Sequence, residues 1–204
     1  MIKTALQNAL ANAWPMLTIF CVIIIAVRLA YVRINRRDFI LHNEIMTLFF
    51  ILYTLLLFEL LTGTENSSYG QNLIPFTEIF RYKVGSELFY YNVIGNIVMF
   101  IPFGYFVSRY INANKISSIF VVTLVASFTV EIVQSRIGRA FDIDDIILNV
   151  AGSICGFLLH IALAAIKKHM PEFLQRDFIY DVLSVIFLIA FFYFFSQTIG
   201  FGWL

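Results

Sequence analysis

The sequence predicts an all-α, polytopic integral membrane protein, a helical bundle of six membrane-spanning helices. Of its 204 residues, 60% are hydrophobic and only 13% are charged, and its mean hydropathy is +0.85. A soluble domain has roughly 45–50% apolar and about 25% charged residues. The apolar residues also fall in long runs, and a membrane-spanning helix needs about 20 consecutive, mostly apolar residues.

The apolar runs place the six spans at Ala13–Val32, Ile45–Leu61, Asn92–Ile111, Ile116–Ile137, Asp145–Ile166 and Phe178–Thr198. We expect residues 1–204 to form one membrane domain. The first run is interpreted as a retained span, because an arginine cluster and no Ala-x-Ala cleavage site follows it. Pro102 lies inside the third run and predicts a kink there, since proline removes a backbone hydrogen bond.

Charge and cysteine content exclude several classes of protein. The net charge of +1 gives no basic surface for nucleic acid. Cys21 and Cys155 lie far apart in apolar runs, without the spacing of a metal site, and are expected to be small buried hydrophobic residues.

The orientation follows from the Lys and Arg residues in alternate connections. The connections after the first, third and fifth spans carry eight of them, and the other side carries five. Because cytoplasmic loops are enriched in Lys and Arg, both termini and the charged loop 136–145 are predicted to be extracytoplasmic.

A dense polar cluster interrupts the apolar pattern between Glu131 and Gly156. Polar groups at membrane depth are costly and usually functional. Glu131 and Gln134 are three residues apart on one helix face, so they project in one direction. The turn that follows them carries Arg136, Arg139, Asp142, Asp144 and Asp145. Asp144 is expected to cap the fifth helix, and with Glu131 the cluster has a net charge of −2.

Three kinds of ligand suit these side chains. Glu131, Asp142 and Asp145 offer oxygen ligands for a divalent cation, the one cofactor that the sequence suggests. The same carboxylates suit a cationic group. Alternatively, Arg136 and Arg139 suit a phosphate.

Further polar residues follow helical spacing in the third and fifth spans. Asn92 and Asn96 are four residues apart, and Asp145 and Asn149 share a helix face with Gly152 and Gly156. The two glycines form a small-residue packing motif, and we expect them to be structural, as we do Pro102 and Gly104. The third, fourth and fifth spans are predicted to form a bundle with an outer mouth lined by Asn92, Asn96, Glu131, Gln134, Arg139, Asp142, Asp145 and Asn149.

These residues also resemble a known family. The segments are Asn72–Phe76 (Asn-Leu-Ile-Pro-Phe), Asn92-x-x-x-Asn96, Phe100-Ile-Pro-Phe-Gly104, Glu131-x-x-Gln134 and Arg139-x-x-Asp142-x-x-Asp145-x-x-x-Asn149-x-x-Gly152-x-x-x-Gly156. In this order they are similar to the VanZ-like family, named for a teicoplanin-resistance protein of Gram-positive bacteria. The resemblance covers about residues 45–166, with the spans 13–32 and 178–198 as additions.

The resemblance implies a multi-pass protein of the bacterial plasma membrane that gives low-level resistance to teicoplanin and lipoglycopeptides. Its expected partners are the lipid bilayer and either a lipid-linked cell-wall precursor or the lipoglycopeptide itself. An intramembrane enzyme that modifies the precursor or the drug is one alternative. In that case Glu131 or Asp142 would be the general base and Arg139 would stabilise negative charge. A small lipid or solute transporter is the other alternative.

Overall fold

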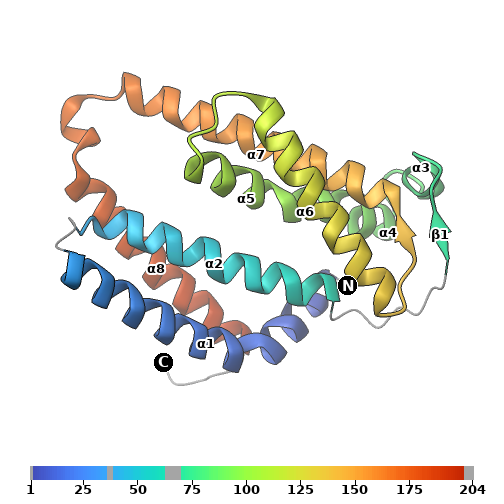
Figure 1. Cartoon of the computed structure of the whole chain (residues 1–204), viewed down its shortest axis with the longest axis horizontal. Helices are drawn as coiled ribbons and strands as arrows, with labels where there is room; N and C mark the ends of the chain where they lie inside the picture. Colours follow the sequence, from blue (N-terminus) through green and yellow to red (C-terminus); the bar gives the residue numbers. More distant parts are fainter. Residues whose placement is uncertain (1, 36–38, 63–69, 200–204) are drawn as a thin grey trace. The chain divides into compact units, whose positions relative to one another are not determined.

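The computed structural model describes residues 2–35, 39–62 and 70–199, and most of them are helical (Figure 1). Helical segments are α1 (Ile2–Asn35), α2 (Leu41–Thr62), α3 (Thr77–Arg81), α4 (Glu87–Phe89), the π-helical turn η1 (Tyr90–Ile94), α5 (Gly95–Tyr110), α6 (Ile116–Arg136), α7 (Ile143–His169), the 3-10 turn η2 (Glu172–Gln175) and α8 (Asp177–Ile199). The strands β1 (Gln71–Asn72) and β2 (Phe141–Asp142) pair in parallel.

The predicted membrane helical bundle is confirmed. Within the described residues, five segments are long and apolar enough to cross a membrane: Ala13–Asn35, Leu41–Leu61, Glu87–Tyr110, Ile116–Arg136 and Ile143–His169. Helix α8 occupies the position of the sixth predicted span, although the side chains from 194 onwards lie outside the described residues. Long apolar runs fold this way because a helix satisfies its own backbone hydrogen bonds in lipid.

Several boundaries differ from the sequence prediction. Helix α1 begins eleven residues earlier, at Ile2, and contains Pro15. The third span is one helical run from Glu87 that includes the π-helical turn η1, and Pro102 lies inside α5. Two of the arginines used for orientation, Arg36 and Arg37, and residues 63–69 lie outside the described part.

The chain divides into two compact units. Unit 1 comprises Leu60–Ile166 with the first two residues, and unit 2 comprises Lys3–Glu59 and Lys167–Leu204. Unit 2 contains two polar pairs: Arg28 contacts Glu44 at 2.6 Å, and His42 Nδ1 contacts Asp181 Oδ1 at 2.9 Å. In both pairs, polar side chains that lie beside apolar runs satisfy each other's hydrogen-bonding capacity.

Unit 1 is built on close contact between α5 and α7. A Cβ atom added to Gly104 would lie 2.0 Å from the carbonyl oxygen of Ser153, and one added to Gly152 would lie 2.2 Å from that of Ile97. At Gly156 the corresponding distance to the carbonyl oxygen of Ile101 is 2.0 Å. Only glycine permits this approach of two backbones, as the small-residue motif predicts.

The cysteine prediction is wrong for Cys155. Both cysteines are free thiols, Cys21 is half-buried and Cys155 is exposed. An apolar side chain on a membrane-spanning helix can face lipid, so an apolar run does not require burial inside the protein.

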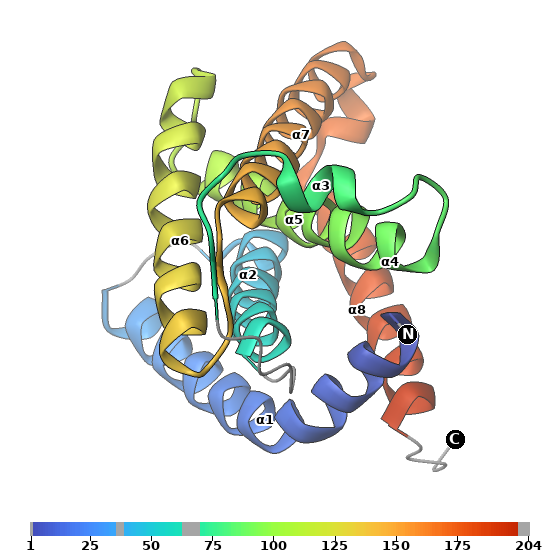
Figure 2. The same ribbon diagram turned by 90° about the vertical axis from the view of Figure 1, so that its right-hand side faces the viewer.

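One connection, residues 70–86, runs back over the bundle, and we call it the strap. It contains β1 and α3, which lie beside the beginning of α7 (Figure 2). Gln71 pairs with Phe141, and Asn72 pairs with Asp142. This two-residue bridge places the strap beside the charged turn between α6 and α7.

Candidate functional site

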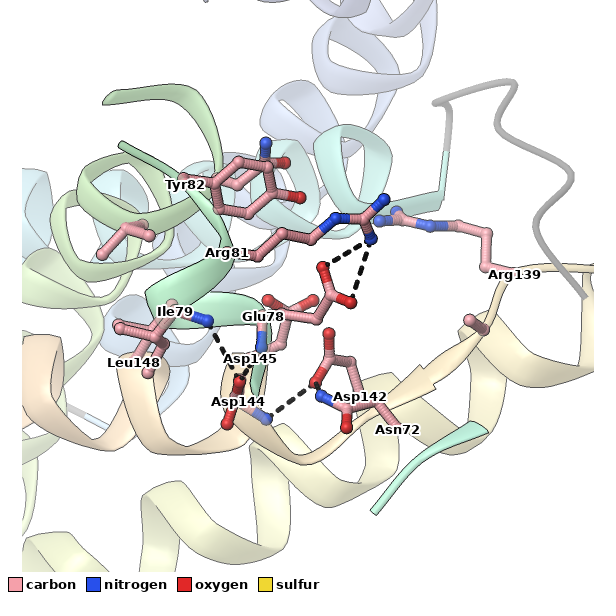
Figure 3. A pocket seen from close by; sticks show the side chains of 13 residues that line it. Asn72, Glu78, Ile79, Arg81, Tyr82, Arg139, Asp142, Asp144, Asp145 and Leu148 are labelled. Carbon is pink, nitrogen blue, oxygen red and sulfur yellow. Dashed lines mark hydrogen bonds and ion pairs between the residues drawn. The ribbon is translucent and has the colours of Figure 1, made fainter. Parts of the chain in front are cut away.

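The strap and the bundle enclose a polar pocket of about 260 Å³ within unit 1 (Figure 3). Its lining residues are Asn72, Glu78, Ile79, Arg81, Tyr82, Asn92, Val93, Arg139, Ala140, Asp142, Asp144, Asp145 and Leu148. Four carboxylates and two guanidinium groups therefore share one small space. The strap contributes one wall, and η1, α7 and the turn before α7 contribute the other.

Asp142 links the strap to the start of α7. Its Oδ1 accepts hydrogen bonds from Asn72 Nδ2 at 2.8 Å and from the Asp144 backbone N–H at 2.9 Å. Asp142 directly precedes α7, so the second bond is that of an N-cap. Burial raises the pKa of the Asp142 carboxyl above its ordinary value, and these hydrogen bonds oppose that rise.

Asp144 has a different role from the predicted one. It lies in the first turn of α7, and its carboxylate turns away from that helix to the strap. Oδ1 accepts the Phe76 N–H at 2.5 Å, and Oδ2 accepts those of Glu78 at 2.7 Å and Ile79 at 3.1 Å. Asp142 therefore caps α7, and Asp144, only 1% exposed, fixes the beginning of α3 (Figure 3).

Glu131 contacts the backbone of a pocket residue, Asp142, without lining the pocket itself. Its side chain is 1% exposed, and Oε2 accepts the Asp142 N–H at 2.9 Å. The residue is not among those that line the pocket. A buried carboxylate in a membrane span requires such a partner, and this one fixes the backbone that carries Asp142.

Gln134 and Arg139 converge on one backbone oxygen at the end of α2. Gln134 Nε2 and Arg139 Nη1 donate to the Leu61 carbonyl at 3.0 and 2.8 Å. Gln134 is buried and does not line the pocket, whereas Arg139 does. Gln134 thus makes an interhelical hydrogen bond, the packing role that polar side chains often have in membranes.

The asparagines occupy two levels of the bundle. Asn92 lines the pocket, and Asn96 donates to Asp145 Oδ1 at 2.6 Å. Asn149 is buried on α7, one helical turn after Asp145, and donates to Ser127 Oγ at 2.8 Å. Asn92 and Asp145 therefore belong to the pocket, while Asn96 and Asn149 hold α5 and α6 against α7.

The strap supplies site residues that the sequence interpretation did not include. Glu78 and Arg81 pair at 3.1 Å on α3, and Tyr82 follows them. The available signal was the i, i+3 charge pair directly after the Asn72–Phe76 segment. In contrast, Arg136 is exposed at the end of α6 and does not line the pocket.

The described carboxylates are not grouped as a ligand set for a divalent cation. Among the described residues, no group of three or more His, Cys, Asp or Glu side chains is placed to hold a metal ion. Hydrogen bonds direct Glu131, Asp142 and Asp145 to different protein donors. The divalent cation suggested by the sequence therefore has no assembled ligand set here.

Comparison with known proteins places these residues in a family. The VanZ/LLP1 family model matches residues 16–168, from α1 to the end of α7. Protein VanZ of Enterococcus faecium is 30% identical over 132 residues, which cover 63% of this chain and 73% of that protein. No solved structure shows a significant match.

Proposed function

The chain belongs to the VanZ/LLP1 family, and on this basis we propose that it lowers bacterial susceptibility to teicoplanin-type lipoglycopeptides through its polar pocket. One observation carries the proposal. Asn72, Asn92, Arg139, Asp142 and Asp145, which come from three segments of the family resemblance, all line one pocket. These five residues are spread over some 70 positions of sequence, from Asn72 to Asp145, and yet share this space.

The size of the pocket restricts what it binds. Sites for small molecules usually measure about 300–1,000 Å³, and this pocket measures about 260 Å³. It therefore accommodates a peptide end or a lipid headgroup and is too small for a complete lipoglycopeptide. Its carboxylates suit N–H donors or a cationic group, and its two arginines suit a carboxylate or phosphate. We propose that it binds the polar end of a lipid-linked cell-wall precursor, or a polar group of the drug.

The proposed orientation places the pocket on the extracytoplasmic side of the plasma membrane, where the drug acts. The distribution of Lys and Arg supports this orientation. A membrane-impermeant maleimide tests it on Lys83→Cys, an exposed polar position of the strap, with Cys21 and Cys155 replaced by Ala. Labelling is expected in intact cells; labelling only after permeabilisation would place the pocket on the cytoplasmic side.

Susceptibility of a sensitive Gram-positive host tests the function, with teicoplanin beside vancomycin and matched protein levels. The informative variant is Asp142→Asn, because an amide oxygen can still accept both hydrogen bonds while the charge is removed. We expect teicoplanin protection by the parent protein and its loss in this variant. Arg136→Gln, outside the pocket, is the matched control and should protect fully. Equal protection by the parent and Asp142→Asn would exclude the charge of the pocket from the function.

A second candidate function is an intramembrane enzyme that modifies the precursor or the drug. The supporting observation is that burial raises the pKa of Asp142 in a pocket that also contains Arg139. Such a carboxyl suits general acid–base catalysis, and a guanidinium suits developing negative charge. Mass spectrometry of precursor and drug after incubation with the protein separates the two candidates, because binding alone leaves both masses unchanged.

A further inference from the structure

The strap has two chemically different faces. Asn72, Glu78, Arg81 and Tyr82 line the pocket. Between them in sequence, or directly after them, lie large apolar side chains with high exposed fractions: Leu73 59%, Ile74 71%, Phe76 50%, Phe80 81% and Val84 79%. We call these five residues the apolar ridge. Five large exposed apolar residues within one short connection indicate an interaction surface.

The ridge is held in a defined conformation. The β1–β2 bridge fixes one end, and the Asp144 carboxylate fixes the Phe76, Glu78 and Ile79 amides. Phe76 itself adopts a left-handed backbone with φ 68°, which is unusual for a large residue. The fold thus stabilises a costly backbone conformation while leaving the Phe76 side chain half exposed.

We infer that the apolar ridge inserts into the interfacial layer of the lipid bilayer. The segment Glu87–Tyr110, which is able to span the membrane, begins directly after the strap, and exposed apolar residues continue from Val84 through Leu88 to Tyr90. The same apolar surface therefore extends from a membrane span onto the strap. Arg81 and Lys83 add basic groups beside it, as is typical of segments that lie at a membrane surface.

Insertion places the pocket within the headgroup layer, because the same short strap forms its wall. The polar end of an amphiphile then reaches the pocket while its apolar tail stays in the bilayer. This consequence for the ligand rests on the proposed function. The insertion itself does not, and it is measurable without any drug.

Tryptophan fluorescence in liposomes tests the insertion. Trp14 and Trp203, the two tryptophans of the chain, are replaced by Phe, and single reporters are introduced as Phe80→Trp on the ridge and Tyr82→Trp in the pocket. Phe120→Trp, on the exposed side of α6, is the reference for a lipid-facing span. We expect phospholipids brominated near the headgroup to quench Phe80→Trp at least twofold more than Tyr82→Trp, and aqueous iodide to show the opposite order.

Two results would overturn the inference. Strong iodide quenching of Phe80→Trp without bromine quenching would place the ridge in water. Protection from both quenchers would mean that protein covers it. Val84→Cys with a nitroxide label gives a second measurement if the tryptophan variants do not fold. Its accessibility to oxygen should then exceed its accessibility to a water-soluble nickel complex. Susceptibility assays remain separate, so failure of the insertion and failure of the resistance function are distinguishable.

Discussion

Asp144 on α7 accepts the backbone N–H of Phe76 at 2.5 Å, although 68 positions separate the two residues. Phe76 has a left-handed backbone with φ 68°, so this contact holds the strap at a conformationally costly residue. With the Glu78 and Ile79 amides, three donors depend on one carboxylate. One buried side chain therefore attaches the α3 part of the strap to α7, in addition to the β1–β2 bridge at the start of the strap.

Replacing Asp144 by Asn should release the strap. One acceptor oxygen of the carboxylate becomes an NH2 group, which faces backbone donors, and each unsatisfied buried group costs about 1–3 kcal/mol. We expect faster proteolysis of the strap and a lower unfolding temperature in detergent. Glu172→Gln, at an exposed acid, is the charge-matched control. Equal proteolysis of Asp144→Asn and the parent protein would contradict the anchoring role.

Asp142→Asn should stabilise the protein in a pH-dependent manner. Burial raises the pKa of Asp142 above 3.8, its ordinary value, so the folded state binds this proton more tightly than the unfolded state. The parent protein therefore loses stability as the pH rises from 3.8 through the raised pKa, whereas the amide does not titrate. The stability advantage of the variant over the parent, followed by thermal unfolding, is expected to increase from pH 4 to pH 7. A constant difference would be inconsistent with a raised pKa.

Gly152→Ala should be severely destabilising, since its Cβ would lie 2.2 Å from the Ile97 carbonyl oxygen. Overpacking costs typically about 1–3 kcal/mol, and rigid backbone on both sides favours the upper end. Gly95→Ala is the matched control on α5, because its nearest contact is an ordinary 3.6 Å. Alanine there should be neutral or stabilising by about 0.5–1 kcal/mol, from the lower chain entropy of alanine. Thermal unfolding of both variants in detergent provides the comparison.

Thr123 and Ser127 offer a paired test on one face of α6. Both are fully buried; Ser127 accepts from Asn149, whereas the Thr123 hydroxyl has no hydrogen-bond partner among the described residues. Thr123→Val should leave stability unchanged or raise it, because it removes an unsatisfied polar group. Ser127→Ala should lower it by about 1–3 kcal/mol, since Asn149 loses its acceptor. Thermal unfolding in detergent measures both changes. A destabilised Thr123→Val would contradict the absence of a hydrogen-bond partner for the Thr123 hydroxyl within the described part of the chain.

Much of the site could be anticipated from helical spacing. Asn92, Asp145 and Arg139 were expected at one mouth and do line one pocket. The glycines of α7 were expected to pack, and their positions leave no room for a Cβ atom. These relationships depend on neighbouring turns of a helix, which periodicity reveals. The role of Asp144 was not accessible in this way, because capping its own helix and binding a distant strap require the same residue type.

The sequence by itself determined the membrane class and the approximate positions of the helices, because long apolar runs can satisfy their backbone hydrogen bonds in lipid only as helices. It also located the polar cluster, since charge is rare elsewhere in the chain. Tertiary structure decided which cluster members meet. Contacts such as those of Asp144 with the strap and of Gln134 with Leu61 join residues more than 60 positions apart. No local pattern encodes such contacts; they follow from the path of the strap beside α7 and from the packing of α6 against the end of α2.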